Sequence, residues 1–104
     1  MNYRVAISAN ARADIHEVTR WLEKERSAAL AESWLEGLYR ALKALETHPE
    51  RCPLAMENDK FAFEIRELLH GRSKRGKYRI VFEIIDDTVY ILYVRHSARD
   101  EIEP

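Results

Sequence analysis

The sequence predicts an α+β fold in which two helices pack on one face of a largely antiparallel sheet. Three patterns support this prediction. Apolar residues alternate with polar ones near the N-terminus, they then recur every three or four residues, and two runs dense in Tyr, Val, Ile and Phe lie near the C-terminus. The expected order is an N-terminal strand, an antiparallel two-helix hairpin and a three-stranded antiparallel meander. A length of 104 residues is typical of one domain, so we expect 1–104 to form a single domain.

The first strand and both helices follow from local signals. Residues 3–7 alternate as a half-buried strand does, and Ser8 then stands where a helix N-cap belongs. Ser27 begins a second helix, which is expected to end at His48 because Pro49 pushes the preceding residue out of the helical region. The short break before Ser27 leaves no room for a strand, so the helices must form a hairpin. The expected core stripes are Ala11, Ile15, Val18 and Leu22, broadened by Trp21, and then Leu30, Trp34, Leu38, Leu42 and Leu45.

The C-terminal half is expected to form the meander. Residues 49–62 show no period and are expected to be a loop, after which Ile65, Leu68 and Leu69 suggest a strand. The runs Tyr78–Ile85 and Thr88–His96, with two aspartates between them, predict a β-hairpin. With Ile85 opposite Thr88, an unbroken register places one set of side chains toward the helices and the other set outward. The inward set is Tyr78, Ile80, Phe82, Ile84, Val89, Ile91, Tyr93 and Arg95, and the outward set is Arg79, Val81, Glu83, Tyr90, Leu92, Val94 and His96.

Composition narrows the class of protein. The 17 basic residues balance 18 acidic ones, which excludes a uniformly basic nucleic-acid coat. The single Cys52 cannot form an internal disulfide, and no apolar run resembles a signal peptide or a membrane span, so we expect a cytoplasmic protein with no membrane association. The four histidines lie far apart in the sequence, and no glycine-rich phosphate loop is present. We therefore expect no metal site and no cofactor.

The charge is unevenly distributed along the chain. Residues 66–79 contain six basic residues and one acid. This segment could neutralise phosphates or bind an acidic partner, or it could be an ordinary solvated turn, and the residues alone do not separate these alternatives. The candidate residues for contact with nucleic acid or another target are Arg66, Arg72, Lys74, Arg75 and Lys77.

Arg79, His96 and Arg99 form the one set of residues that suggests chemistry. The unbroken register places Arg79 and His96 on the same face of the sheet, and Arg99 lies just beyond the last strand. A histidine with two arginines could cleave RNA without a metal, because the reaction needs an acid, a base and cations around the phosphate. The alternative, which we favour, is that Arg79 and Arg95 form ion pairs with Glu83, Glu67 or the terminal acids.

The order of several weak motifs is more specific than any one of them. Ala13-Asp14-Ile15 opens a helix, and the C-terminal half carries the runs Ile65–Leu68, Gly76–Ile84 and Asp86–Asp100, the last of which contains Val-Arg-His-Ser-Ala-Arg-Asp. Together these segments resemble the ParE/RelE toxin superfamily of type II toxin–antitoxin modules across almost the whole chain. The resemblance implies a small cytoplasmic toxin, of the kind found in plasmid stabilisation systems, that a cognate antitoxin encoded in the same operon holds inactive.

The resemblance allows two activities. In ribosome-dependent mRNA endonucleases similar to RelE, Arg79 and Arg99 would match two arginines that act at the phosphate, and His96 could serve as acid or base. Glu67, however, stands where those enzymes commonly have a catalytic lysine. The strand Arg66-Glu67-Leu68, the long helix pair and the C-terminal motif look more like the ParE branch, whose members inhibit DNA gyrase without a catalytic site. A gyrase inhibitor is therefore expected first, with an mRNA endonuclease or an inactive relative as alternatives.

The antitoxin is expected to cover apolar surface. The predicted outward face of the sheet is partly apolar, as a covered face would be. An antitoxin segment could lie there, or it could add a strand to a sheet edge or a helix to the helix hairpin. The expected antitoxin contacts on the outward face are Val81, Tyr90, Leu92 and Val94.

Overall fold

The computed structural model describes residues 2–71 and 77–96 and confirms the predicted α+β architecture. Arg72, Lys74, Arg75 and Arg99 lie outside the described residues, so their expected roles stay predictions. The helices and strands are β1 (Arg4–Ile7), α1 (Ala9–Glu25), α2 (Ala28–Ala44), β2 (Arg66–His70), β3 (Tyr78–Ile85) and β4 (Thr88–His96), with short 3-10 helices at Pro49–Arg51 and Asn58–Lys60.

Both helices begin where their serines predict. The Ser8 Oγ accepts a hydrogen bond from the Ala11 amide, and the Ser27 Oγ accepts one from the Leu30 amide, each at 3.0 Å. These side chains satisfy amide groups that have no partner within the helix. The second helix ends at Ala44, earlier than predicted, and a turn leads to His48, whose φ of 51° places it in the left-handed region before Pro49.

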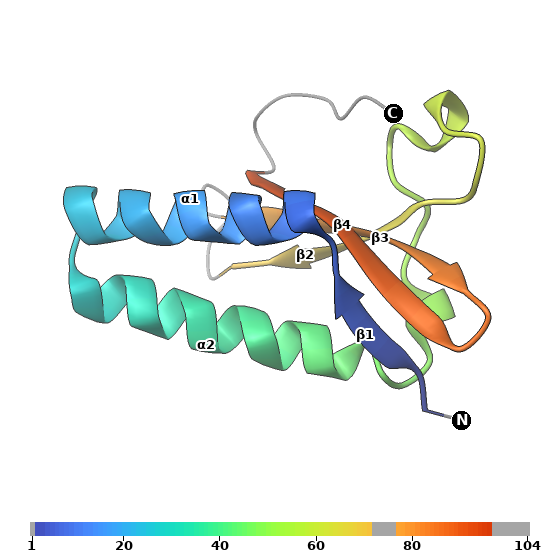
Figure 1. Ribbon diagram of the computed structural model, residues 1–104, viewed down its shortest axis with the longest axis horizontal. Coiled ribbons are helices and arrows are strands. Elements are labelled where there is room, and N and C mark those ends of the chain that lie inside the picture. The colour runs from blue at the N-terminus through green and yellow to red at the C-terminus, as the bar shows by residue number, and fades with distance from the viewer. Residues whose placement is uncertain (1, 72–76, 97–104) are drawn as a thin grey trace.

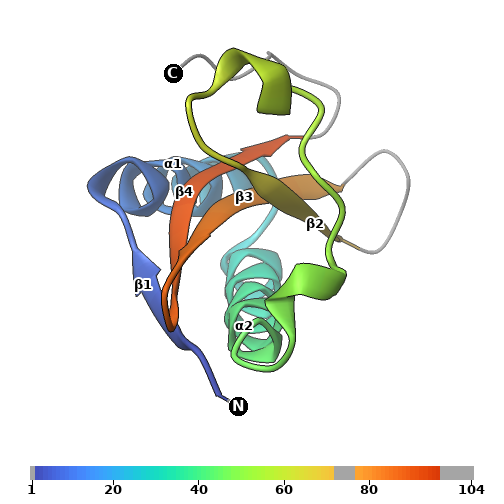
Figure 2. The same cartoon turned by 90° about the vertical axis from the view of Figure 1, so that its right-hand side faces the viewer.

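The four strands form one mixed sheet in the order β1-β4-β3-β2. The meander β2-β3-β4 is antiparallel, as predicted, whereas β1 lies at the edge of the sheet and runs parallel to β4. Both helices cover the same face of this sheet (Figures 1 and 2). We call that face the inner face and the opposite one the outer face.

The inner face carries the main hydrophobic core. Side chains from both helices meet the sheet there, and most are fully buried: Ala11, Ile15, Leu38, Leu42, Leu45, Ile80, Phe82, Val89, Ile91 and Val94. Trp34 is partly buried against this cluster. Trp21 and Leu30 were expected in the core but are 47% and 43% exposed. Both lie within a few residues of the connection between the helices, and this end of the helix pair projects beyond the sheet (Figure 1).

A part of the predicted loop covers the outer face. We call residues 53–65 the covering segment. It is bound to the edge of β2, because the Glu67 amide donates a hydrogen bond to the Pro53 carbonyl at 3.0 Å. Within the segment, the Ala55 amide donates to the Ile65 carbonyl at 2.8 Å. Between this segment and the sheet lies a second, smaller apolar cluster, in which Ala55, Phe61 and Ile65 of the segment meet Val81, Leu92 and Tyr93 of the sheet.

A β-bulge divides the β3–β4 hairpin into two halves. From the turn to the pair Phe82–Ile91 the register is the predicted one, and Ile85 lies opposite Thr88. The next residue of β3, Val81, lies opposite Tyr93, so Leu92 is the additional residue of the bulge. Beyond this point every side chain of β4 changes face. The predicted faces of Tyr93, Val94, Arg95 and His96 are therefore wrong: Val94 and His96 lie on the inner side, and Tyr93 and Arg95 lie on the outer side.

Candidate functional site

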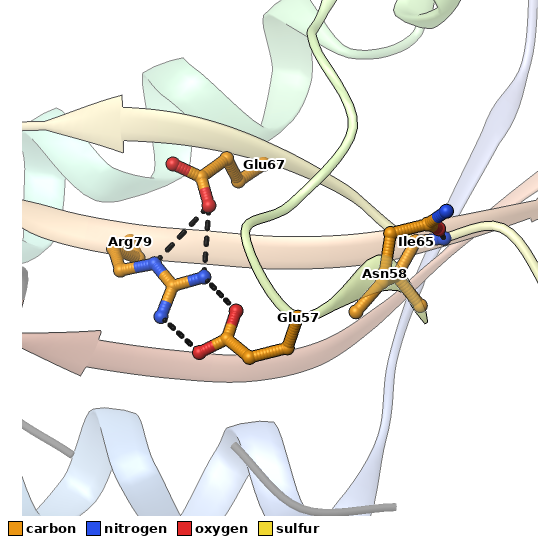
Figure 3. A network of polar contacts seen from close by, with 5 residues as sticks. All are labelled: Glu57, Asn58, Ile65, Glu67 and Arg79. Atoms are coloured by element: carbon orange, nitrogen blue, oxygen red, sulfur yellow. Dashed lines mark hydrogen bonds and ion pairs between the residues drawn. The ribbon is translucent and has the colours of Figure 1, made fainter. Parts of the chain in front are cut away.

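Arg79 lies on the outer face between two carboxylates. Its Nη1 and Nη2 donate to the two oxygens of Glu57, at 2.9 and 2.5 Å, and its Nε and Nη2 donate to one oxygen of Glu67, at 3.2 and 2.8 Å (Figure 3). Glu67 comes from β2, the neighbouring strand, whereas Glu57 comes from the covering segment. Paired bonds of this kind between a guanidinium and a carboxylate are among the strongest hydrogen bonds in proteins.

The Arg79 network is largely buried, which indicates a role in stabilising the fold rather than in binding a ligand. The side chains of Arg79 and Glu57 are 3% and 2% exposed, and that of Glu67 is 18% exposed. The hydrogen bond to Glu57 and, less strongly, the one to Glu67 raise the pKa of Arg79 above its ordinary value despite the opposing effect of burial. Arg79 is thus charged, covered and hydrogen-bonded through all three of its nitrogens. In this arrangement it cannot contact a phosphate, and the favoured expectation that it pairs with Glu67 is confirmed.

The covering segment holds Glu57 in place through a hydrogen bond within the segment. The Asn58 Oδ1 accepts from the Ile65 amide at 2.9 Å (Figure 3), which closes the segment on itself next to Glu57. Glu57 was not among the expected partners of Arg79. The signal in the sequence was that Arg79 directly precedes the apolar run Ile80-Val81-Phe82. Such a run indicates a buried strand, and a buried cation needs a counter-charge, but the run does not identify the acid.

His96 lies on the other side of the sheet from Arg79. Its ring meets the Tyr78 ring edge-on, with centroids 5.2 Å apart, and Tyr78 in turn lies edge-on to Trp34 at 5.2 Å. The expected trio of Arg79, His96 and Arg99 required Arg79 and His96 to share a face, which the bulge prevents. The described residues therefore do not bring these two side chains together as a catalytic pair.

The same aromatic group includes His70 of β2. Its ring lies 6.0 Å from that of Trp34, and a Cβ at Gly37 would approach the His70 Cε1 to 3.0 Å, so α2 packs closely on this imidazole. Burial lowers the pKa of His70, an effect that the Trp34 backbone opposes and Arg40 adds to. The buried Nε2 of His70 and Nε1 of Trp34 have no hydrogen-bond partner among the residues that the structure describes.

Arg66, the first residue of β2, binds the segment that follows α2. Its Nη1 donates to the carbonyls of Cys52 and Glu50, at 2.7 and 3.3 Å, and its Nη2 lies 3.5 Å from an oxygen of Glu64. These contacts hold the chain after α2 against the start of β2. Lys77, the other described member of the expected basic surface, is half-buried and directly precedes β3.

Asp14 of α1 was not expected to contact the sheet. Its Oδ2 accepts from the Val94 amide at 2.9 Å and from the Arg95 Nε at 3.1 Å. Arg95 also lies over the Tyr93 ring, 5.1 Å from its centroid. Arg95 was expected to pair with Glu83, Glu67 or the terminal acids. The terminal acids lie outside the described residues, and the partner that the structure shows for Arg95 is Asp14. The carboxylate satisfies an amide of β4 beyond the reach of β1.

Two of the four expected antitoxin contacts are buried inside the protein. Val81 is 0% exposed beneath the covering segment, and Val94 is 1% exposed in the inner core. The expectation that they form an accessible surface is wrong, because the covering segment hides the first and the bulge turns the second inward. Tyr90 is 38% exposed and Leu92 is half-buried, so these two are the accessible remainder of the expected surface.

Residues 2–71 and 77–96 contain no group of three or more His, Cys, Asp or Glu side chains placed to hold a metal ion. Within the same ranges, no helix is long and apolar enough to cross a membrane.

Comparison with known proteins gives the family. Residues 5–101 match the model of the ParE toxin of the parDE type II toxin–antitoxin system. No curated protein matches the chain. Among solved structures, a chain of the chromosomal ParDE system from P. aeruginosa is similar in fold, with a TM-score of 0.72 and 14% identity over 90% of this chain and 95% of that one. Because the family match covers nearly the whole sequence, the chain belongs to the ParE toxin family of type II toxin–antitoxin systems.

Proposed function

We propose that the protein inhibits DNA gyrase as a toxin, that it does so by binding and without cleaving RNA, and that a ParD-type antitoxin from the same operon neutralises it. Membership of the ParE family supports the gyrase target. One observation supports a toxin that does not cleave RNA: the Arg79 side chain is 3% exposed, and its guanidinium pairs with Glu57 and Glu67.

An mRNA endonuclease would need a different arrangement of the same residues. Arg79 would have to leave two carboxylates to reach a phosphate, and His96 lies on the opposite face of the sheet. Releasing Arg79 would also leave the carboxylate of Glu57 buried without its cation, which is costly. These contacts favour the binding-type toxin over the enzyme.

The experiment is induction of the protein in cells, followed by two measurements. We expect an SOS response and filamentation with intact mRNA, and we expect the purified protein to inhibit gyrase supercoiling in vitro. Rapid mRNA cleavage with arrested translation would contradict the proposal. In that case His96→Gln should abolish cleavage, and the matched change His16→Gln, at an exposed position of α1, should not.

The antitoxin has a separate test. We expect the product of the neighbouring open reading frame to suppress toxicity and to co-purify with this protein as a stable complex. Tyr90→Ala should weaken that complex and Tyr39→Ala, which removes a similarly exposed tyrosine from α2, should not. The opposite result would place the antitoxin on the helix hairpin. A neighbour that neither binds nor suppresses toxicity would contradict the antitoxin assignment and leave the gyrase assay unaffected.

A further inference from the structure

A groove of about 430 Å³ lies at the edge of the sheet, away from the Arg79 network. It forms because β3 runs past the start of β2 toward the hairpin turn (Figures 1 and 2). The first residue of β2, Arg66, lies opposite Phe82, so the end of β3 has no strand beside it on that side. The groove is lined by Glu50, Phe63, Glu64, Arg66, Glu83, Ile84 and Ile85.

The backbone of Ile84 points into this open edge. Ile85 lies opposite Thr88 at the two-residue turn, and such a pair directs its amide and carbonyl groups toward β4. Successive residues of a strand alternate in the direction of these groups, so those of Ile84 point the other way. In the part of the chain that the structure describes, nothing pairs with the Ile84 amide or carbonyl. An open edge of this kind is a template for strand addition.

The side chains around the edge suit a segment with apolar and basic residues. Phe63 and Ile85 are 46% and 47% exposed and offer apolar contact. The three carboxylates of the groove outnumber its one guanidinium, that of Arg66, which is already bound to two carbonyls and lies near Glu64. Burial raises the pKa of Glu83, and a cation placed beside this carboxylate would favour its charged form.

We propose that the groove binds an extended segment of a partner protein that adds as a short strand beside Ile84 and places a lysine or arginine next to Glu83 and Glu64. Main-chain hydrogen bonds to Ile84 provide the anchor, and the carboxylates select a basic segment over an acidic one. Glu83 lies opposite Tyr90 in the β3–β4 pairing, so the groove adjoins the contact proposed for the antitoxin. A peptide titration contains neither gyrase nor antitoxin, so a failure of peptide binding leaves the proposed function unaffected.

The test is a titration of the full-length protein, labelled with ¹⁵N, with a capped peptide of alternating valine and lysine. The same peptide with glutamate in place of lysine is the comparison. We expect the Ile84 and Glu64 amide signals to shift, the hydrogen exchange of the Ile84 amide to slow, and the lysine peptide to bind about tenfold more tightly than the glutamate peptide. Equal response to both peptides, or shifts confined to other surfaces, would overturn the proposal.

Two kinds of variant isolate the two parts of the site. Ile84→Pro removes the edge amide, which the ladder to β4 does not use, and should abolish peptide binding, whereas Ile84→Val keeps the amide and should bind normally. Glu83→Gln should weaken binding of the lysine peptide about threefold to tenfold, whereas Glu36→Gln, at an exposed position of α2, should not. If Ile84→Pro fails to fold, the Glu83→Gln comparison still decides. Ile84 shifts that depend on protein concentration without peptide would overturn the proposal by identifying a second copy of the chain as the occupant.

Discussion

The inner face of the sheet is covered by two long helices through apolar contacts, whereas the outer face is covered by a short irregular segment held by charge. The buried residues of the inner cluster come mainly from both helices and from β3 and β4, and partly buried residues of β1 and β2 pack against them. The outer cluster has three buried apolar residues, and the Arg79–Glu57 pair lies beside it. Apolar area stabilises the first cover, and paired buried charges fix the position of the second.

Because different forces hold the two covers, we expect them to fail in different ways. Loss of inner apolar contact should lower the stability of the whole domain, because the helices have no other surface to bury. Loss of outer charge pairing should open the covering segment first, since few apolar contacts remain to hold it.

Phe82→Ala should destabilise the whole protein by about 3–5 kcal/mol, because it creates a cavity in the inner core where Phe82 is fully buried. Denaturant unfolding followed by circular dichroism measures the change. Leu30→Ala, at a position that is 43% exposed, is the control and should have a much smaller effect. Similar losses for the two variants would mean that the inner face is not the main source of stability.

Glu57→Gln should destabilise by about 2–3 kcal/mol, less than full removal of a buried partner because Glu67 still pairs with Arg79. Hydrogen exchange should accelerate in residues 53–65 and change little in α1 and α2. Replacing both partners, with Glu57→Leu and Arg79→Met, should restore most of the loss, since the remaining Glu67 reaches solvent. Uniform acceleration across the domain would contradict a separately held cover.

Asp14→Ala should cost about 1–2 kcal/mol, because it leaves the Val94 amide and Arg95 without their shared acceptor. This residue joins α1 on the inner side to a β4 side chain on the outer side. Thermal unfolding measures the loss, and Glu17→Ala, at an exposed position of the same helix, is the control. No difference between the two variants would show that the covers are joined elsewhere.

The smallest expected effect is a pH dependence that belongs to the inner face. Burial lowers the pKa of His70 below the 6.5 of an unburied histidine, so the unfolded chain binds this proton more readily. The contribution to stability is complete above pH about 6.5 and is lost as the pH falls through the folded pKa. Arg79 on the outer face does not titrate in this range. Denaturant midpoints between pH about 7.5 and 5 should fall less steeply in His70→Gln than in His16→Gln, and equal slopes would remove His70 as the cause.

Local sequence signals were enough to predict the helices and strands, but they did not predict the contacts between residues far apart in the sequence. The limits of β3 and β4 followed from their β-prone runs, and Ser8 and Ser27 marked both helix starts, because caps and strand propensity act over a few residues. Glu57 and Asp14 could not be assigned from the sequence. Each reaches a partner on a distant strand, and any acid in an aperiodic loop or on an exposed helix face would look the same.

The bulge was hidden for a different reason. It lies in the run Ile91-Leu92-Tyr93-Val94, where every residue is apolar or aromatic, so alternation carries no mark of an additional residue. The expected faces of His96 and Arg95 depended on counting through this run. The expected catalytic pair and the expected antitoxin contact of Val94 both depended on this count, and the bulge removes the support for both.

Leu92 is a single additional residue in β4, and its effect extends along the rest of the strand. Each side chain of β4 after Leu92 lies on the opposite face of the sheet from the one it would occupy in an unbroken register. Deletion of one residue from this run would return His96 to the side of Arg79 and move Val94 from the inner face to the outer face. Within a toxin family, the chemistry presented by this strand can therefore diverge through a length change of one residue, with its histidines and arginines all retained.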